Sequence, residues 1–483
     1  MSIDLYPKGF PAMHDIALTQ IQAEGYLPQL QPRCPSLAQQ LVHLLHQVLV
    51  LAQESTAIQA PECRPRGRPP LLSLQHLYLA LLMGVLRQTP HLSTIWRRLY
   101  LEEIGTFAPV QVTYEAVRKR LLSTGTTALQ HLFETVSHGL DQWSQSQHLS
   151  ALSLAPFASQ VVALDESTFD RLRRLTADLR DLPTGDPHLV PGKLAGLFDL
   201  RLQRWVRVQF RADVLASCNT GILLLLEGLA PGSLILADLG YFSFPWFDYL
   251  SGQGYWWVSR LKEGVTYEIK EVLAYDDHTG LLDAIVWLGK YRADRAAHAV
   301  RLVSFSFHGT QYRYLTNVLS PTHLSLHDIA QLYARRWDIE LAFKLLKCEL
   351  GLHLWWGARP ELVMIQLWLT LILAQVLHAL QLQVALQAEV EPFDVSLHLL
   401  VELLETIPAG PTPLIARLVQ DGRVLGLIRP SSRLTVVVPE IQPHMLCPPP
   451  DLKDLVRHAR YAQRNPHPRP APFVSRFSTQ LLI

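Results

Sequence analysis

The spacing of apolar and polar residues divides the chain into a helical first part, a strand-rich middle part and a helical last part. Apolar residues recur every three or four positions in the first part, which predicts helices there. These predicted helices span residues 73–88, 93–102, 113–122 and 127–143. From residue 160 onward the pattern changes to short β-branched runs, which predict strands. After residue 351 the helical spacing returns and continues to about residue 406.

The most regular stretch of the chain runs from Ser325 to Gly351. Ser325 and Asp328 have the spacing of a capping box at a helix start, and Gly351 stands where a helix end favours a left-handed residue. Apolar residues at helical spacing form one stripe between these ends: Ile329, Leu332, Ile339, Phe343, Leu346 and Leu350. We therefore predict a single helix of about seven turns, buried along this stripe.

A second, polar stripe runs beside the apolar one. Its members are Tyr333, Arg336, Glu340 and Lys347. At ~100° per residue these side chains fall within a sector of roughly 60°, so a phenol, a guanidinium and an ammonium flank one carboxylate. One interpretation is an exposed helix face with ion pairs between successive turns. The other is the rim of a site at which the two cations hold an anion such as phosphate.

This spacing, Tyr-x2-Arg-x3-Glu-x6-Lys, resembles the signature helix of the DDE transposases of bacterial insertion sequences, in the insertion-sequence-four group. The resemblance implies that Glu340 is the third acidic residue of a catalytic triad on an RNase H-like core. It also implies that Tyr333, Arg336 and Lys347 bind the phosphates of the transposon-end DNA. Two aspartates are then expected upstream.

Asp165 and Asp238 meet this expectation, because each ends a short apolar run with the composition of a buried strand. An aspartate at a strand end is common in turns, but this edge of an open α/β sheet is also where sites assemble. The motifs around the two aspartates, and Arg260 at the end of the next predicted strand, occur in the order found in the family. We expect Arg260 to bind DNA. Glu166 departs from the family, in which a small residue is frequent there, and it either approaches the site or points away.

Two aspartates and a glutamate from distant parts of the chain make sense together if they surround divalent metal. Hard oxygen ligands suit Mg²⁺, for which Mn²⁺ can substitute. We predict two ions held by Asp165, Asp238 and Glu340, with Asp165 bridging them. Two ions about 3.5–4 Å apart activate the attacking oxygen and stabilise the leaving oxygen of a phosphodiester. Such a site hydrolyses or transfers phosphodiester bonds.

The predicted elements follow the order strand, strand hairpin, helix, strand, helix and strand. This order is expected of an RNase H-like fold, an α/β class with a mixed sheet covered by helices. We assign residues 156–400 to this catalytic domain, with a β-rich insertion at 263–312. Residues 1–155 form an all-helical N-terminal region that we expect to bind DNA, and 401–483 form a helical and basic C-terminal tail.

The linker at residues 61–70 is rich in proline and arginine. Its prolines and glycine exclude helix and sheet, so Arg64, Arg66 and Arg68 form an extended basic strip. The strip resembles the core of an AT-hook, which places arginine in the minor groove of A·T-rich DNA. The alternative is a solvated linker between helices.

The predicted helix at 113–122 is a second candidate for DNA contact. It carries Arg118, Lys119 and Arg120 and follows a polar turn, an order that suits the second helix of a helix-turn-helix facing the major groove. An ordinary solvated helix with three cations is the alternative. The resemblance implies that recognition of the terminal inverted repeats belongs to this N-terminal region.

Composition narrows these interpretations. The net charge of +1 gives no global electrostatic footprint for nucleic acid, so DNA binding must come from local basic surfaces. The five cysteines are scattered without a CxxC motif, which favours reduced thiols and argues against a zinc site. The N-terminus lacks the pattern of a signal peptide, and polar residues interrupt the apolar segment 362–386, which favours a buried helix over a membrane span. We therefore expect a cytoplasmic, bacterial protein that associates with the nucleoid through DNA and not with membranes.

Together these features predict a transposase. It would bind double-stranded DNA at the terminal inverted repeats of its own element, cleave a strand with water and join the freed 3′-hydroxyl to target DNA. The resemblance further implies a homodimer in the synaptic complex. A stand-alone metal nuclease on the same fold is one alternative, which strand-transfer assays distinguish. A catalytically silent, transposase-derived DNA-binding protein is the other, and the presence of all three acids disfavours it.

Overall fold

The structure is a computed structural model that describes residues 71–146, 154–289, 294–407, 412–431, 437–448, 453–461 and 481–482. The predicted DNA-binding residues of the linker, Arg64, Arg66 and Arg68, lie outside these ranges. The described part begins with helices near their predicted positions: α3 (Leu74–Leu86), α4 (Leu92–Leu101), α5 (Tyr114–Thr124) and α6 (Thr127–Ser146). The hydroxyls of Ser73 and Thr113 accept hydrogen bonds from N–H groups in the first turns of α3 and α5, which a helix start otherwise leaves open.

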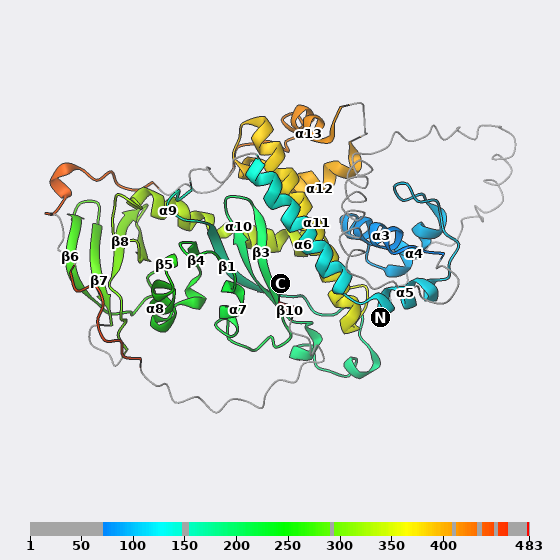
Figure 1. Ribbon diagram of the computed structural model, residues 1–483, viewed down its shortest axis with the longest axis horizontal. Coiled ribbons are helices and arrows are strands. Elements are labelled where there is room, and N and C mark those ends of the chain that lie inside the picture. The colour runs from blue at the N-terminus through cyan, green and yellow to red at the C-terminus, as the bar shows by residue number, and fades with distance from the viewer. Residues whose placement is uncertain are drawn as a thin grey trace, which may run out of the picture.

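Among the described residues, ten strands form one mixed sheet in the order β10-β3-β2-β1-β4-β5-β9-β8-β7-β6 (Figure 1). The first strands along the chain are β1 (Val161–Thr168), β2 (Lys193–Asp199), β3 (Arg204–Arg211), β4 (Leu234–Ala237) and β5 (Trp256–Arg260). β1, β2 and β3 form an antiparallel meander, and β4 lies parallel to both β1 and β5. These directions and this order are those of an RNase H-like sheet, so the predicted fold class is confirmed.

The β-rich insertion extends this sheet instead of forming a separate one. Its strands are β6 (Tyr267–Asp276), β7 (Leu281–Leu288), β8 (Val300–Phe307) and β9 (Thr310–Thr316). They pair as antiparallel neighbours, and β9 pairs in turn with β5. Gly280 and Gly309 have φ of +64° and +73° in the turns before β7 and β9, a backbone conformation that glycine adopts without steric cost. Figure 1 shows the insertion at the end of the sheet away from α3, α4 and α5.

Helices cover both faces of the RNase H-like sheet. On one face lie α9 (Leu326–Arg335), α10 (Trp337–Lys344) and α11 (Pro360–Ala388), and on the other lie α7 (Ile222–Leu226) and α8 (Phe244–Gly252). Successive residues of β1, beginning with Val161 and Val162, pack into the two cores in turn. The same alternation directs Asp165 toward the face of α10 and Glu166 toward the face of α7 and α8.

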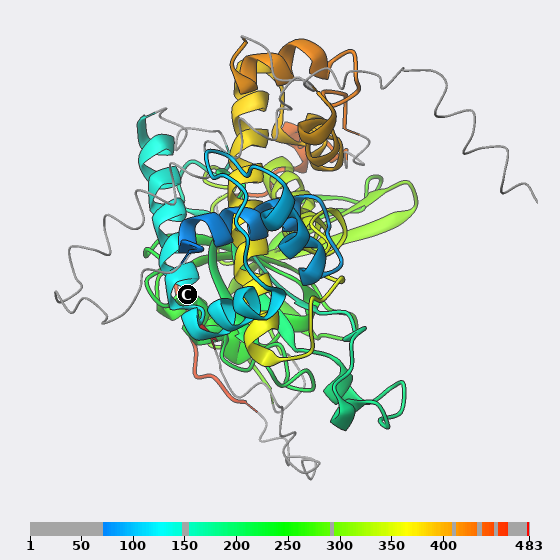
Figure 2. The same ribbon diagram turned by 90° about the vertical axis from the view of Figure 1, so that its right-hand side faces the viewer.

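The central helix of the protein is α11, which packs against helices from both ends of the chain (Figures 1 and 2). In the part of the chain that the structure describes, it is the one helix long and apolar enough to cross a membrane. However, 94% of its most apolar window is buried inside the protein. Its buried Gln375 side chain accepts a hydrogen bond from the N–H of Trp205 and donates one to the carbonyl of Trp205, so this amide has partners inside the protein. These contacts support the prediction of a buried core helix.

The C-terminal region begins with helices and continues as extended chain. The helices are α12 (Leu397–Thr406) and α13 (Leu414–Gly422), and the last strand, β10 (Leu481–Leu482), pairs with β3. Residues 453–461 lie along the insertion. There the Arg457 guanidinium donates to the carbonyls of Leu288 and Ala296 and lies 4.6 Å from the centre of the Trp287 ring. This arginine of the basic tail is therefore used inside the protein.

Candidate active site

The two predicted aspartates follow paired positions on neighbouring parallel strands. Leu164 of β1 lies opposite Ala237 of β4, and the next residue along each strand is Asp165 and Asp238 respectively. Adjacent strands are about 4.8 Å apart, so the two aspartates are close neighbours. Both belong to the alternate set of residues that faces α10. The sheet therefore presents them together to the signature helix.

The signature helix differs from the single regular helix that the pattern predicts. The capping box of Ser325 and Asp328 is present and Gly351 has φ +63°, so both predicted ends are confirmed. The prediction of an uninterrupted helix is wrong, because α9 and α10 meet at Arg336, whose N–H bonds to the carbonyl three residues earlier. The last turn, η5 (Leu345–Glu349), is a π-helix with wider hydrogen bonding. This wider turn changes the angular position that a regular helix gives Lys347.

Residues between the signature positions fix the helix to the sheet. The buried Asp338 carboxylate accepts hydrogen bonds from Arg335 Nε at 2.8 Å and from Gln203 Nε2 at 3.1 Å. Arg335 also donates to the carbonyl of Leu200 at 2.7 Å. Leu200 and Gln203 lie in the turn between β2 and β3, so this cluster attaches the signature helix to the hairpin beside β1.

Arg336 lies between two of the three acids. Its Nη2 donates to Glu340 Oε1 at 2.7 Å, and its Nη1 is 3.7 Å from Asp165 Oδ2. The side chain is buried, and its Nε and Nη1 have no hydrogen-bond partner within the described ranges. Burial alone lowers the pKa of Arg336, but the hydrogen bond to Glu340 and the nearby charge of Asp238 raise it above the usual value. The guanidinium is therefore held in its charged form.

The Asp165 carboxyl group is perturbed by all of these neighbours. Burial raises its pKa to about 6, and the charges of Glu340 and Asp238 act in the same direction. The Glu166 N–H, which donates to Asp165 at 2.8 Å, and the charge of Arg336 oppose the rise. The structure thus brings the three predicted acids to one place. Among the residues with described positions, no three His, Cys, Asp or Glu side chains are arranged to hold a metal ion. The positive charge next to Asp165 and Glu340 is that of the Arg336 guanidinium.

Tyr333 and Arg260 border the acids. The Tyr333 ring packs against Tyr314 with the ring centres 5.2 Å apart, and its buried hydroxyl has no partner in the described part of the chain. Burial raises the pKa of Tyr333 to about 12, against the lowering effect of Arg336. Arg260 ends β5 opposite Tyr314 of β9 and is exposed. The positive charge of Arg260 lowers the pKa of Tyr333, so Arg260 is near the Tyr333 hydroxyl, at the edge of the same site.

Lys347 lies beside the end of β1, beyond Asp165. Its ammonium donates to the carbonyl of Thr168, the last residue of the strand that carries Asp165. Burial lowers the pKa of Lys347. It belongs to the π-helical turn η5, and such turns occur frequently at functional sites.

Comparison with known proteins gives the family that carries this arrangement. The family model described as the transposase DDE domain matches residues 193–376, which include Asp238 and Glu340. The chain contains a DDE transposase domain. The predicted family is thereby confirmed, although the matched region begins after Asp165.

Two individual proteins resemble the chain around this DDE domain. The transposase for insertion sequence element IS231D of Bacillus thuringiensis subsp. finitimus is 23% identical over 309 residues, which are 51% of this chain and 61% of that relative. The chain thus spans about three fifths of the length of the curated relative it matches. A cryo-EM structure of the piggyBac transposase synaptic complex with hairpin DNA shares 10% identity, covering 84% of this chain and 87% of its own, with a TM-score of 0.38. A TM-score this low adds nothing to the assignment.

The predicted DNA contacts Arg118, Lys119 and Arg120 lie apart from the acids of the DDE domain. They are on α5, which packs against α4 and α11, and Figure 1 shows α3, α4 and α5 separate from β1 and β4. Arg118 pairs with Glu115 at 2.7 Å, and Lys119 is exposed. Residues 102–113 separate α4 from α5, a longer connection than the three or four residues of a helix-turn-helix. The structure therefore does not support that motif here, and DNA contact by α5 stays a prediction.

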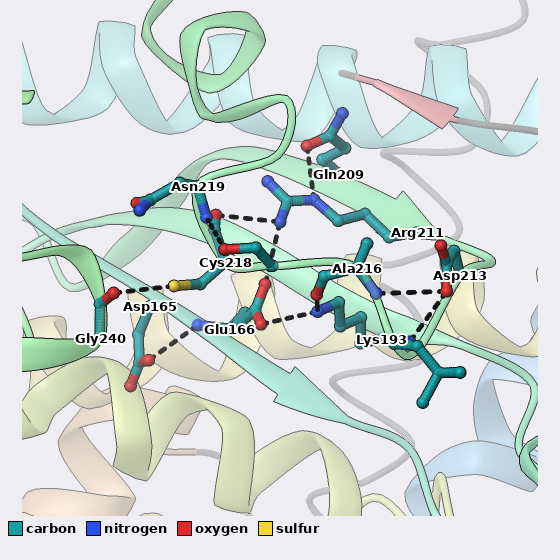
Figure 3. A network of polar contacts seen from close by, with 12 residues as sticks. Asp165, Glu166, Lys193, Gln209, Arg211, Asp213, Ala216, Cys218, Asn219 and Gly240 are labelled. Carbon is teal, nitrogen blue, oxygen red and sulfur yellow. Dashed lines mark hydrogen bonds and ion pairs between the residues drawn. The ribbon is translucent and has the colours of Figure 1, made fainter. Parts of the chain in front are cut away.

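Glu166, whose direction the sequence left open, points away from the acids of the DDE domain (Figure 3). Its carboxylate pairs with Lys193 Nζ at 2.8 Å and with Arg211 Nη1 at 2.9 Å. The Lys193 ammonium also donates to the carbonyl of Ala216, and Arg211 donates to Gln209 Oε1 at 3.0 Å. Both cationic side chains are buried.

Sequence reasoning missed Lys193 and Arg211. A signal was present, because Lys193 begins a strand in which every residue is buried, and a buried lysine needs a partner. The partner was not identifiable, because strand pairing brings Lys193 opposite Arg211 and next to β1. The network is a buried ionic cluster on the opposite side of β1 from the acids.

Proposed function

We propose that this protein is a DNA transposase that cleaves DNA at the ends of an insertion sequence and joins the 3′-hydroxyl to target DNA. The observation that supports the proposal is the meeting of Asp165, Asp238 and Glu340 around Arg336, in a chain with a DDE transposase domain. The acids come from β1, from the end of β4 and from α10, which are far apart in sequence. Because carboxylates repel one another, their gathering costs stability and favours a functional reason.

The same acids suit divalent metal. DDE transposases generally use divalent metal ions, and carboxylate oxygen is a ligand that Mg²⁺ prefers. We infer that Asp165, Asp238 and Glu340 hold two Mg²⁺ ions, for which Mn²⁺ can substitute. The raised pKa of Asp165 supports this inference. A nearby cation would offset part of the free-energy cost of the buried negative charge and of its repulsion by the other acids, which are the causes of the rise. When bound, such ions activate the attacking oxygen and stabilise the leaving oxygen of a phosphodiester.

The side chains around the acids are suited to hold the DNA backbone. The Nε and Nη1 groups of Arg336 and the Tyr333 hydroxyl are buried donors without a hydrogen-bond partner in the described residues, and a phosphate oxygen satisfies such donors. Arg260 and Lys347 add positive charge beside them. We infer that the Arg336 guanidinium orients the scissile phosphate against the carboxylates, which would be held by the cation when it is bound.

Recognition of the DNA ends is assigned to the N-terminal region. We infer that Arg118, Lys119 and Arg120 contact the terminal inverted repeats, together with the arginines of the linker 61–70. Two copies of the chain would act together in the synaptic complex, in the bacterial cytoplasm. The exposure of Lys119 and the similarity to an insertion-sequence transposase support this part of the proposal.

Cleavage of DNA that carries the inverted repeats flanking the gene tests the proposal. Purified protein is incubated with labelled duplex ends and Mg²⁺, and both the nicked and the joined products are measured. We expect Asp165→Asn, Asp238→Asn and Glu340→Gln each to lower cleavage at least about a thousandfold, while binding of the ends is largely retained.

Glu349→Gln is the matched control. Glu349 follows Glu340 on the same helical segment but pairs with His398 at 2.7 Å, so this variant is expected to cleave like the wild type. Unchanged cleavage in one of the three acid variants removes that residue from the triad. Absent or metal-independent cleavage by the wild type overturns the proposal, and cleavage without joining indicates a nuclease.

A further inference from the structure

The loop of residues 169–192 joins β1 to β2 and is folded rather than open. Hydrogen bonds from the Phe169 N–H to Gly192 and from the Leu172 N–H to Leu189 close it, at 3.0 and 2.8 Å. It contains two short helical turns, η2 (Ala177–Leu179) and η3 (Pro187–Leu189). Figure 2 shows this loop projecting from the body of the protein at the lower right. Its side chains are therefore held in place by the loop itself.

A cavity of about 660 Å³ lies within this loop. Leucine side chains form part of its wall, and its charged lining consists of Asp170, Arg171, Arg173 and Arg180, with His353 from the chain after η5. Three guanidinium groups thus stand against one carboxylate. The volume lies in the range of ligand pockets, and the charge selects an anion.

The arginines of the loop differ in what they bond. Arg174, which does not line the cavity, donates to two backbone carbonyls outside the loop at 2.9 and 3.3 Å and so anchors the loop. Arg171 donates to a carbonyl within the loop. Arg173 and Arg180 are exposed, and neither guanidinium pairs with any described residue. These two arginines line the cavity without an evident structural task.

The cavity adjoins the candidate active site through Lys347. The Nδ1 atom of His353 lies 2.6 Å from the carbonyl oxygen of Lys347, whose ammonium donates to Thr168 at the end of β1. Trp355 Nε1 donates to the carbonyl of Asp170 at 3.1 Å and fixes the adjoining wall. Positive charge therefore continues from the strand that carries the acids, through Lys347, into the cavity.

We propose that this cavity is a subsite for the DNA backbone, here named the arginine pocket after Arg171, Arg173 and Arg180. It rests on the proposed function and deepens it, because it adds phosphate contacts beyond the signature helix. The guanidinium groups of Arg173 and Arg180 bind phosphodiester oxygens of the strand that passes Lys347, since the planar fork of arginine matches phosphate. Contacts of this kind hold any DNA sequence and set the position of the strand.

The salt dependence of DNA binding tests the arginine pocket. The dissociation constant of one linear duplex is measured over a series of salt concentrations for the full chain and for the Arg173→Ala/Arg180→Ala double variant. We expect binding about ten- to a hundredfold weaker at low salt. We also expect a slope of log affinity against log salt that is smaller by about 0.9 for each DNA phosphate that the variant no longer neutralises.

Two further variants control for charge and folding. Arg423→Ala removes one positive charge from the exposed end of α13, outside the pocket, and is expected to leave affinity and slope close to wild type. Arg173→Lys/Arg180→Lys keeps the charge and is expected to keep the slope while losing part of the affinity, because lysine lacks the fork. If the alanine double variant does not fold, the lysine pair and the single Arg173→Gln and Arg180→Gln variants decide the question.

The outcomes separate the pocket from the proposed function. Unchanged affinity and slope in the arginine variants, alongside metal-dependent cleavage by the wild type, overturn the pocket alone. If the wild type binds duplex DNA but cleaves no end, the proposed function falls, and the slopes still decide the pocket. If the wild type does not bind duplex DNA, both are overturned. If inorganic phosphate binds the wild type and the arginine variants lose this phosphate binding but keep their affinity for duplex DNA, the pocket is a small-anion site. That result would overturn the DNA subsite.

Discussion

Asp165 and Glu166 are neighbours on β1, yet their carboxylates meet opposite environments. Asp165 faces α10, where the nearest cation is Arg336 at 3.7 Å and where burial and two further acids raise its pKa to about 6. Glu166 faces the other side of the sheet, where Lys193 and Arg211 lie at 2.8 and 2.9 Å (Figure 3). One carboxylate is short of positive charge, and the other has two cations of its own.

The difference separates a site from a structural cluster. A buried polar group with partners holds the fold, whereas donors and acids that gather without enough partners point to a missing ligand. Around Asp165, two nitrogens of Arg336 and the Tyr333 hydroxyl lack hydrogen-bond partners in the described structure. In the ion-pair network of Glu166, Lys193 and Arg211, only the Nη2 atom of Arg211 lacks a hydrogen-bond partner among the described residues. The proximity of charges alone would not have distinguished the two sides.

Removing the Glu166 charge is expected to have the largest effect on stability. Glu166→Gln leaves Lys193 and Arg211 buried without their counter-ion, which costs about 3–5 kcal/mol of the free energy of unfolding. Urea unfolding followed by fluorescence measures the change. Glu349→Gln is the control, because its partner His398 is mostly exposed, and a loss below about 1 kcal/mol is expected. Equal losses in both variants would contradict a special role for the cluster at Glu166.

Removing the Asp165 charge is expected to have the opposite sign and to depend on pH. The folded protein holds the Asp165 proton up to about pH 6, whereas the unfolded chain releases it near the ordinary aspartate pKa of 3.8. The folded state therefore binds more protons in this window, and its stability falls as pH rises, by about 3 kcal/mol in total. Asp165→Asn removes this loss.

Urea unfolding of wild type and Asp165→Asn at pH 4, 5, 6 and 7, with a chelator present, measures this effect. We expect the stability of the variant relative to wild type to increase between pH 4 and pH 7. Parallel pH profiles would show that the neighbours of Asp165 do not strain its charged form.

The sequence predicted those features of the two carboxylates that depend on residues near each other in the chain. It did not predict features that depend on residues far apart in the chain. Asp165 and Asp238 were found because short apolar runs with the composition of buried strands end at them, and Glu340 because helical spacing places it on a polar stripe. The partners of Glu166 are 27 and 45 residues away and are brought to it by strand pairing, which periodicity does not encode.

Two other features escaped the sequence for related reasons. The π-helical turn η5 has no spacing signature of its own, since it contains the same residue types as a regular helix. The arginine pocket needs the loop after β1 to fold back on the chain after η5. The helix caps, in contrast, depend on residues three positions apart and were predicted correctly.

Stabilisation by Mg²⁺ is expected to distinguish Asp165 from Glu166, and it is the smallest of these effects on stability. If Asp165 is a ligand and Glu166 is not, Mg²⁺ at ten times its dissociation constant stabilises the wild type by about 1.4 kcal/mol for each ion bound, because it binds only the folded state. Thermal unfolding with Mg²⁺ or chelator measures the shift, which Glu166→Gln should retain despite its lower stability and Asp165→Asn should lose. Loss of the shift in both variants would mean that the ionic cluster supports the ligand geometry, and retention in both would remove Asp165 from the metal site.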